Sequence, residues 1–458
     1  MRLTRSALCL VAGLFGAAGV DVLHAQQSPP GRSIAPAPPQ TPSGAPLTLD
    51  EAIAQGLANS LRLAELGARQ DSQAAVEQGR AAARRPIIAA QGSYTRTNHV
   101  EEFAIVQPGL GRQVVYPDLP DNFRTRLDLQ WLFYTGGRLD ALERAARAER
   151  QASGEELAAA RSDLRLEITR AFWSLVTARE AEQVLVRALE SSSAYVRDLR
   201  VRLDQGLIPP NELLSAEAQQ SRERLVSIEA ANARGIAEAD LQRLLGTEGP
   251  GPIVPAARLE PLAAEVGDVN QLIAAALDAR PERRALAERV EVARARAEAA
   301  RAGLRPQVGV NGGYDYASPN TRFFPRSDQW QDSWDVSVNA SWTLWDGGRT
   351  RAERADAAAL TRVAEARLSD FDRQVTFEVR QRQLELESSL AAIGTAAEGV
   401  RAAAEARRVV AERFTAGVVT NTEVLDAQTA LLQAELERTR ALASARLAEA
   451  RLARAVGR

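Results

Sequence analysis

Hydrophobic residues recur every seven positions along two long, proline-free stretches of the chain, 138–205 and 349–416. The first row comprises Ile168, Leu175, Leu189, Val196 and Leu203, and the second comprises Val379, Leu386, Ile393, Val400 and Phe414. A heptad row places apolar side chains along one seam of a helix. The pattern therefore predicts two long helices that pack as coiled coils.

Shorter segments with helical spacing flank both long stretches. The predicted ranges are 50–85, 211–245, 269–304 and 422–456. Pro86 and Pro306 follow two of them and end them, because proline disfavours the helical conformation of the residue before it. Each short segment is about half as long as a long helix, so two of them stacked end to end match one long helix.

Apolar and polar residues alternate in four segments that lie between these helices. The predicted strands cover about 87–97, 123–134, 307–316 and 334–345. In the last of them, Val336 and Val338 alternate with Ser337 and Asn339. Alternation at period two gives one apolar and one polar face, which suits either a half-buried soluble sheet or a membrane barrel with lipid outside and water inside.

Four strands are too few to close a barrel, and lipid does not tolerate the open edge of a sheet. If these strands lie in a membrane, the chain must therefore oligomerise. Three copies of the four predicted strands would give 12 strands, and their helices would give a tube of 12 columns. Such a trimer could close on itself.

The same motifs occur twice along the chain at constant spacing. The pair Gly136-Gly137 reappears 211 residues later as Gly347-Gly348, and Gly206 reappears 211 residues later as Gly417. Pro86 and Pro306 are 220 residues apart, so the two spacings differ by 9 residues. The sequence thus predicts two tandem repeats, 47–246 and 269–458, joined by a connector over 247–268. The length difference is assigned to the loops 95–122 and 317–333.

The N-terminal region is predicted to be processed. Arg2 and Arg5 precede a short apolar stretch, and a plausible cleavage site lies before Gln26. This arrangement is typical of a secretory signal peptide over residues 1–25. A proline-rich leader over 26–46 follows it, and removal of the signal would remove Cys9, the one cysteine of the chain.

Composition and motifs give no indication of catalysis. The formal net charge is −2, which does not favour a nucleic-acid partner. The sequence contains no HExxH, CxxC, P-loop or GxSxG motif, and His99 stands alone in a predicted loop. We therefore expect no enzyme activity, no cofactor and no metal site.

Several of these segments resemble one known family, the outer-membrane efflux proteins, which are TolC-like channels of Gram-negative bacteria. The segment Gly303–Tyr314 resembles the helix-to-strand entry of that family, Trp345–Arg349 its strand-to-helix exit, and Phe414–Ala427 its helix-tip turn. The resemblance covers residues 47–458. One departure is that Leu132 and Thr343 stand where the family often has proline.

The resemblance implies a mainly α fold with a membrane β-barrel, in which each repeat supplies two strands, one long helix and two shorter helices. It implies a homotrimer with a 12-stranded barrel in the outer-membrane lipid and an α-helical tunnel across the periplasm. It also implies two partners, a periplasmic adaptor (membrane fusion) protein and an inner-membrane transporter of the RND or ABC type.

The resemblance also assigns roles to the turns at the ends of the long helices. The segments Gly206-Leu207-Ile208 and Gly417-Val418-Val419 would contact the adaptor through their exposed apolar pairs. A purely structural interpretation explains the glycines, which suit a helix end, and makes Asn211 and Thr422 helix caps.

Carboxylates at the family's matching positions ring a closed periplasmic entrance. Glu423 and Asp426 would form this gate, with Glu212 as the counterpart of Glu423 in the first repeat. Arg202 and Arg413 would be latch partners. The alternative is an ordinary solvated helix start, where acidic residues favour the helix dipole.

The sequence leaves a second functional class open. The alternative to an export channel is a periplasmic or surface coiled-coil scaffold whose small sheet is soluble. The alternating strands with aromatic ends and the proline-bounded repeat favour the channel. The predicted junctions between helix and strand lie at Pro86, Pro306 and the glycine pairs Gly136-Gly137 and Gly347-Gly348.

Overall fold

The computed structural model describes residues 46–109, 111–247, 251–263 and 266–458. The predicted signal peptide and nearly all of the predicted leader lie outside these residues. The chain divides into a unit of residues 1–46 and 250–254 and a unit of residues 47–249 and 255–458. Two-residue strands, β1 (Pro46–Leu47) and β6 (Val254–Pro255), lie at the boundaries of these units. All other elements belong to the second unit.

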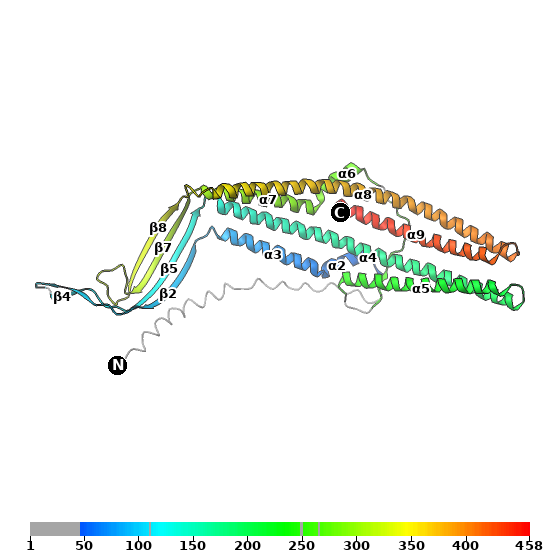
Figure 1. Cartoon of the computed structure of the whole chain (residues 1–458), viewed down its shortest axis with the longest axis horizontal. Coiled ribbons are helices and arrows are strands. Elements are labelled where there is room, and N and C mark those ends of the chain that lie inside the picture. The colour runs from blue at the N-terminus through cyan, green and yellow to red at the C-terminus, as the bar shows by residue number, and fades with distance from the viewer. Residues whose placement is uncertain (1–45, 110, 248–250, 264–265) are drawn as a thin grey trace, which may run out of the picture. The chain divides into compact units, whose positions relative to one another are not determined.

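The first half of this unit, residues 47–246, contains four helices and four strands among its described residues (Figure 1). The helices are α2 (Leu49–Asn59), α3 (Leu61–Ala82), α4 (Arg138–Asp204) and α5 (Pro210–Leu245). The strands are β2 (Ile87–Arg96), β3 (Phe103–Gln107), β4 (Gly111–Tyr116) and β5 (Asp121–Tyr134).

The second half, residues 269–458, follows the same order. Its helices are α6 (Val269–Ala279), α7 (Pro281–Arg301), the short 3-10 helix η2 (Ala302–Leu304), α8 (Arg349–Thr415) and α9 (Asn421–Ala455). Its strands are β7 (Gln307–Ser318) and β8 (Gln331–Ser341). The long helices α4 and α8 each contain 67 residues.

The single helices predicted over 50–85 and 269–304 are wrong, because each range contains a break. Ser60 is extended, ends α2, and accepts a hydrogen bond from the Leu63 amide at the start of α3. In the second half, Arg280 is extended and Pro281 is the first residue of α7. Proline has no amide hydrogen to donate, so it suits the first turn of a helix and interrupts a continuing one.

The four predicted strands form one antiparallel sheet in the order β2-β5-β7-β8. The strand predicted over 334–345 ends at Ser341, opposite Gln307 at the start of β7. Beyond this point β8 has no strand partner in the described chain. The strand β5 continues to Tyr134 because it pairs with β7 as well as with β2.

The predicted loop 95–122 contains the hairpin of β3 and β4. Residues 103–106 of β3 are a continuous apolar run, and Gly109 in the turn and Gly111 at the start of β4 both have positive φ. Glycine adopts this conformation without the steric cost that a side chain adds. The hairpin accounts for part of the extra length of the first half.

The duplication predicted from the sequence is visible in matching hydrogen bonds. The Trp131 indole donates to the Arg84 carbonyl oxygen at 2.9 Å, and the Trp342 indole donates to the Leu304 carbonyl oxygen at 3.0 Å. The two tryptophans are 211 residues apart and the two carbonyls are 220 residues apart. Residues related by the two spacings of the duplication therefore make equivalent hydrogen bonds in the structure.

The heptad rows form the helical core. Ile168, Leu175 and Val196 of α4 are buried, as are Val379 and Leu386 of α8. The helix α4 packs against α2, α3 and α5 of its own half and against α7 and α9 of the other half. The helix α8 packs against α6, α7 and α9.

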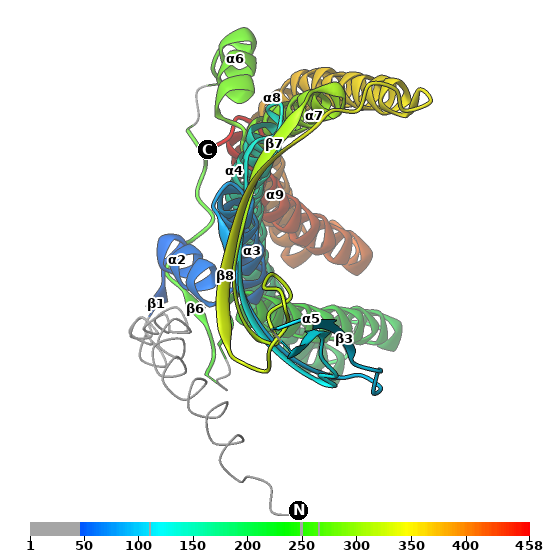
Figure 2. The same cartoon turned by 90° about the vertical axis from the view of Figure 1, so that its left-hand side faces the viewer.

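The sheet is curved, and α5 and α9 project on its concave side (Figure 2). The loop that joins β7 to β8, yellow in Figure 2, lies on the same side, and its Arg322 contacts Asp335. The polar face of the sheet is therefore the concave face.

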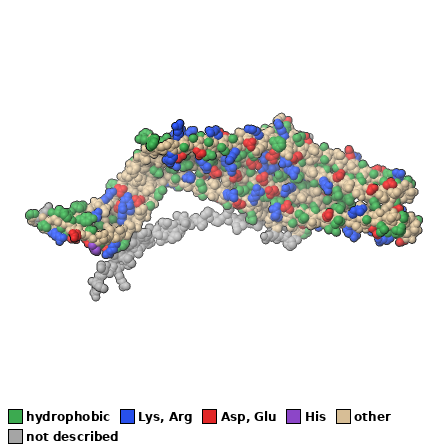
Figure 3. Space-filling view, in the orientation of Figure 1, with side chains coloured by type: hydrophobic (Ala, Val, Ile, Leu, Met, Phe, Trp, Pro, Cys, Tyr) green, Lys and Arg blue, Asp and Glu red, His purple; other side chains and the backbone are tan. Residues whose placement is uncertain are grey.

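Charged side chains of both signs are interspersed over the helices (Figure 3). Within the described residues, no helix combines the length and the hydrophobicity that a membrane-spanning helix requires.

Candidate functional site

The turns between the long helices and their successors have the same backbone geometry in both halves. The Gly206 amide donates to the Leu203 carbonyl and the Leu207 amide to the Arg202 carbonyl, both at 2.9 Å. In the second half, Gly417 donates to Phe414 and Val418 donates to Arg413 at the corresponding positions. This pair of bonds requires a residue of positive φ, and Gly206 and Gly417 have φ of 70° and 73°.

One side chain of each apolar pair is exposed at these turns. Leu207 is 68% exposed and Val418 is 63% exposed. The prediction that both members of each pair are exposed is wrong, because Ile208 and Val419 are half-buried. Ile208 packs against a cluster around Leu213. The surface that a partner could contact is therefore centred on Leu207 and Val418.

The helix caps predicted at Asn211 and Thr422 are wrong by two residues. Pro209 precedes α5, and Thr420 precedes α9. Thr420 forms a capping box with Glu423, whose carboxylate accepts a bond of 3.2 Å from the Thr420 amide. Glu423 thus has a structural role at the start of α9, in line with the alternative prediction of an ordinary helix start.

The remaining candidate gate carboxylates lie near the starts of the two helices that follow the turns. Asp426 of α9 is exposed, as is Glu423, whereas Glu212 of α5 is half-buried. Among the described residues, no group of histidine, cysteine or acidic side chains is placed to hold a metal ion.

A hydrogen-bonded contact joins the two turns. The Tyr195 hydroxyl of α4 donates to Asn421 Oδ1 of α9 at 2.6 Å, and Asn421 Nδ2 donates to the Glu212 carbonyl oxygen at 3.0 Å. Asn421 is only 4% exposed. Burial raises the pKa of the Tyr195 hydroxyl, and the Glu212 carboxylate raises it further, so this group remains a neutral donor.

The two arginines before the turns have different surroundings. Arg202 Nε lies 3.0 Å from Asp198 Oδ2, and its guanidinium lies over the Phe414 ring at 5.4 Å. Arg202 therefore links the two halves through an aromatic ring. Arg413 is exposed, and its side chain forms no ion pair in the part of the chain that the structure describes.

We expect Tyr195→Phe to loosen the contact between the two turns. The variant removes the donor to Asn421 Oδ1 and leaves that buried acceptor unpaired, which costs about 1–3 kcal/mol. Hydrogen exchange of the first turn of α9 should accelerate, whereas Tyr134→Phe, on an exposed tyrosine of the sheet, should not change it. Unchanged hydrogen exchange in Tyr195→Phe would show that this hydrogen bond does not stabilise the contact between the two turns.

The glycine pairs between strand and helix also have positive φ, from 64° at Gly136 to 92° at Gly348. A Cβ on Gly136 would lie 2.5 Å from the Arg305 Cβ, so only glycine fits there. Arg305 Nη1 donates to the Gly136 carbonyl oxygen at 2.9 Å. Arg305 lies between the helices and β7 of the second half, and Gly136 lies between β5 and α4 of the first half. The hydrogen bond therefore links the helix-to-strand junction of one half to the strand-to-helix junction of the other.

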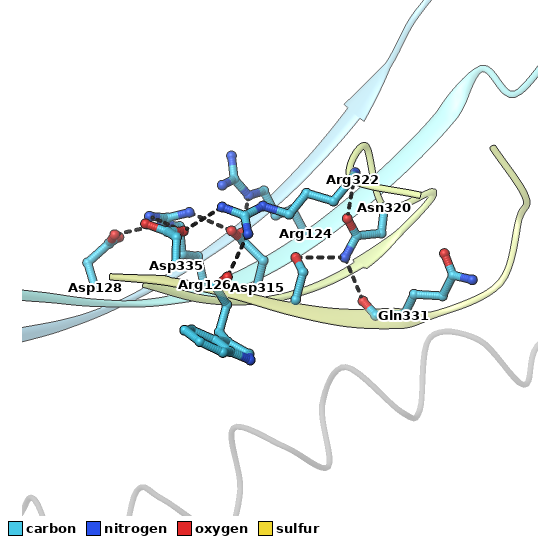
Figure 4. A network of polar contacts seen from close by, with 10 residues as sticks. Arg124, Arg126, Asp128, Asp315, Asn320, Arg322, Gln331 and Asp335 are labelled. Carbon is cyan, nitrogen blue, oxygen red and sulfur yellow. Dashed lines mark hydrogen bonds and ion pairs between the residues drawn. The ribbon is translucent and has the colours of Figure 1, made fainter. Parts of the chain in front are cut away.

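A network of charged side chains covers part of the concave face of the sheet (Figure 4). The Asp315 carboxylate receives bonds from Arg124 Nε and Arg126 Nη1, both at 2.5 Å. Asp335 Oδ1 lies 3.4 Å from Arg126 Nη2 and 3.3 Å from Arg322 Nη2. The network connects β5, β7 and β8 with the loop after β7.

The convex face of the sheet is apolar, and no described residue covers it. Its large side chains are exposed, among them Ile88 at 72%, Val336 at 66%, Val338 at 67% and Trp342 at 63%. Large contiguous apolar surfaces are rare on soluble monomers and mark contact with lipid or protein.

Sequence reasoning missed Tyr195, Asn421 and Arg305. Asn421 aligns with Pro210 in the other half, so the duplication gave no signal for it. Arg305 did have a signal, because Arg85 precedes Pro86 in the same way.

A model of the family described as outer membrane efflux protein matches residues 52–247 and 272–458. Protein CyaE of Bordetella pertussis is 29% identical over 242 residues, which make up 52% of this chain and 50% of that protein. The matched region therefore spans half the length of this curated relative.

Solved structures show the same fold. A membrane protein from Pseudomonas aeruginosa has 21% identity and a TM-score of 0.77, with 89% of this chain and 92% of that chain covered. The outer membrane protein VceC from Vibrio cholerae has 21% identity and a TM-score of 0.74, with 89% and 96% covered.

Proposed function

The chain belongs to the outer membrane efflux protein family, and from this premise we propose that it is the outer-membrane channel-tunnel of a tripartite export system. Three copies would close a 12-stranded barrel in the outer membrane and a helical tunnel across the periplasm. The protein would act as a passive conduit, not as an enzyme, and the inner-membrane transporter would select the cargo.

The observation that carries this proposal is the two-faced sheet with open edges. Its convex face is apolar and exposed, and its concave face carries the charged network, as the wall of a water-filled barrel requires. The edge strands β2 and β8 have no partner beyond the sheet in the described chain. Unpaired edges are not tolerated in lipid, so further strands must come from other copies.

The same geometry argues against a soluble scaffold. A soluble sheet would bury its apolar face against other elements, whereas Val336, Val338 and Trp342 are more than 60% exposed. Outer-membrane fractions of an expressing cell should contain a heat-resistant oligomer. Recovery of the whole product in the soluble fraction would favour the scaffold.

We propose that the turns after α4 and α8, which we call the tip, contact the periplasmic adaptor. Leu207 and Val418 would lie at the centre of this contact. Both side chains are exposed, and the turns that carry them are held by backbone bonds and by other side chains, not by Leu207 or Val418. Partner binding therefore does not require these side chains to leave a core. An inner-membrane transporter of the RND or ABC type would complete the assembly.

We further propose that Glu423 and Asp426 surround the periplasmic entrance. Three copies would place six carboxylates there, and crowded like charges attract multivalent cations. We expect Glu423→Ala with Asp426→Ala to raise single-channel conductance severalfold and to weaken block by multivalent cations in planar bilayers.

The matched control for the gate variant is Glu353→Ala with Asp356→Ala. These acids have the same spacing and are exposed, but they lie near the N-terminal end of α8, which follows the sheet and is remote from the turn at Gly417. They should leave conductance and block unchanged. Equal effects of both double variants, or no effect of either, would contradict the gate assignment.

A further inference from the structure

A cavity of about 410 Å³ lies at the junction between β5 and α4, where the strands meet the helices (Figure 1). Ligand sites in proteins are typically concave, with apolar walls and a few polar groups. The lining of this cavity includes three aromatic and three charged side chains, which are Trp131, Phe133, Tyr134, Arg84, Asp140 and Arg305. The channel function assigns no role to this cavity.

The aromatic side of the cavity continues the apolar convex face of the sheet. Trp131 pairs with Val310, which pairs in turn with Val338, so these three residues share one face. The rings of Trp131 and Phe133 lie 5.9 Å apart, and the two side chains are 41% and 51% exposed. Aromatic residues of this kind border the lipid-facing band of membrane barrels, at the level of the lipid headgroups.

The charged side of the cavity has an excess of positive charge, because two arginines and one aspartate line it. Arg84 Nη1 lies 2.9 Å from Asp140 Oδ1 and 3.4 Å from Glu143 Oε2, so the charge of Arg84 is compensated. Arg305 donates to the neutral Gly136 carbonyl oxygen at 2.9 Å, and it forms no ion pair with any residue that the structure describes. A guanidinium without a counter-charge attracts anions, and its planar fork matches the oxygens of a phosphate group.

The equivalent junction of the second half carries an anion of its own. Asp346 Oδ1 accepts a hydrogen bond from the Gly348 amide at 3.0 Å, and Asp346 Oδ2 accepts one from the Thr350 amide at 2.8 Å. Asp346 aligns with Thr135 in the first half, at the spacing of 211 residues. Thr135 lines the cavity and is uncharged, so the first half has the cation Arg305 and no acid at this position.

We propose that this cavity binds the headgroup phosphate of an anionic phospholipid whose acyl chains lie on the convex face of the sheet. Arg305 binds the phosphate, and Trp131 and Phe133 contact the glycerol and the upper part of the chains. The proposal rests on the proposed function in one respect, that the convex face lies in the outer membrane. The cavity then lies at the level of the headgroups of the periplasmic leaflet, because the helices begin at this junction.

The place of the cavity in the sheet favours a lipid over a second copy of the chain as its occupant. The strand β5 is an inner strand, between β2 and β7. Copies that join at the edge strands β2 and β8 therefore leave the convex side of this junction open to the membrane. A free phosphate ion would compensate Arg305 but would leave the aromatic side of the cavity uncovered.

The test measures lipid retention by native mass spectrometry of the heat-resistant oligomer, purified in detergent. The oligomer is incubated with phosphatidylglycerol or with phosphatidylcholine of the same acyl chains. We expect about one molecule of phosphatidylglycerol per chain and about fivefold less phosphatidylcholine, whose headgroup has no net charge. Equal retention of the two lipids would overturn the proposal.

Two variants assign the retention to this cavity. Thr135→Asp gives the first half the carboxylate that the second half has at Asp346, and this charge should compensate Arg305 and repel phosphate. Arg305→Gln removes the cation directly. Each variant should retain about fivefold less phosphatidylglycerol than the parent protein.

The matched control is Arg351→Gln, which removes an exposed arginine near the start of α8, at the junction that already has Asp346. It should retain as much phosphatidylglycerol as the parent protein. Parental retention by both Thr135→Asp and Arg305→Gln, or an equal loss in Arg351→Gln, would overturn the proposal, because the lipid would then bind elsewhere or to surface charge in general.

Preincubation with excess inorganic phosphate separates a lipid site from a site for a free anion. Phosphatidylglycerol should stay bound, because its acyl chains add apolar contact that inorganic phosphate lacks. Displacement of the lipid by inorganic phosphate would identify a free-anion site and overturn the lipid assignment.

Failure of the lipid site and failure of the proposed function give different results. If the parent protein is a heat-resistant oligomer that conducts ions but retains no phosphatidylglycerol, the lipid site is wrong and the channel stands. If the parent protein neither oligomerises nor conducts, the proposed function itself is wrong.

Discussion

Export is expected to fall to the level of a deletion strain when Leu207→Asp and Val418→Asp are combined. Each side chain projects from a tip turn, with 68% and 63% of its surface exposed. A partner that covers these positions would have to bury two carboxylates per copy without counter-charges, and unpaired buried charges cost several kcal/mol each. The adaptor should then no longer co-purify with the channel.

The folded state should not change in this variant, because the turns depend on backbone bonds and on Gly206 and Gly417. Oligomer formation and single-channel conductance therefore serve as internal controls. Phe103→Asp with Val106→Asp, on the exposed β3–β4 hairpin, is the matched surface control and should export normally. Normal export and adaptor binding by the tip variant would contradict the assignment of the tip.

A large loss of stability is expected for Arg454→Ala. Arg454 of α9 is 8% exposed, and its Nη2 lies 2.7 Å from Asp163 Oδ1 of α4 and contacts the Glu282 carboxylate of α7. Removal of Arg454 leaves Asp163 without this partner and leaves Glu282 with Arg280, at 3.5 Å. Loss of one member of a buried ionic cluster costs up to about 3–5 kcal/mol. The temperature of thermal unfolding of the purified protein should fall accordingly.

The duplication supplies the control for this variant. Arg243 is the counterpart of Arg454 in the first half, but its side chain is 69% exposed and it pairs with Asp240, one turn away, at 2.8 Å. We expect Arg243→Ala to cost less than about 1 kcal/mol. Similar losses in both variants would show that burial of the network is not the source of its effect.

The same cluster predicts that the stability of the folded state depends on pH. Burial alone would raise the pKa of Glu282, but the hydrogen bond and the charge of Arg454 outweigh burial and hold this pKa below its usual value of 4.5. A carboxyl with a lowered pKa stabilises the folded state above its unfolded pKa, and this contribution is lost as the pH falls through the folded pKa. Unfolding temperatures measured below pH 4.5 should therefore fall less steeply in Arg454→Ala than in the parent protein.

The regular parts of the fold could be predicted because they repeat a short-range pattern. The heptad rows locate α4 and α8, and alternation locates the strands of the main sheet. Gly206 and Gly417 could be assigned to turns because their backbone conformation has a strong residue preference. Each of these signals lies within a single helix, strand or turn.

The misses in the helices have in common that a single residue decided them. Pro281 lies within a segment of helical periodicity and still begins a new helix, and Ser60 produces the equivalent break with no proline. Thr420, not Thr422, caps α9, because a glutamate three residues later completes the capping box. The periodic pattern continues through these positions and so conceals them.

The contact between the tips could not be predicted, since it joins residues far apart in sequence. Tyr195 and Asn421 are 226 residues apart, and nothing in either local pattern connects them. The spacing of the duplication relates equivalent positions and says nothing about contacts between nonequivalent ones. Packing of α4 against α9 brings these two residues together.

The central claim, that this chain forms an oligomeric channel in the outer membrane, is tested most directly by single-channel recording. The full chain, extracted from outer membranes of an expressing cell and purified as the heat-resistant oligomer, should insert into planar bilayers and give uniform conductance steps. A purified product that is monomeric, soluble without detergent and silent in bilayers would contradict the claim.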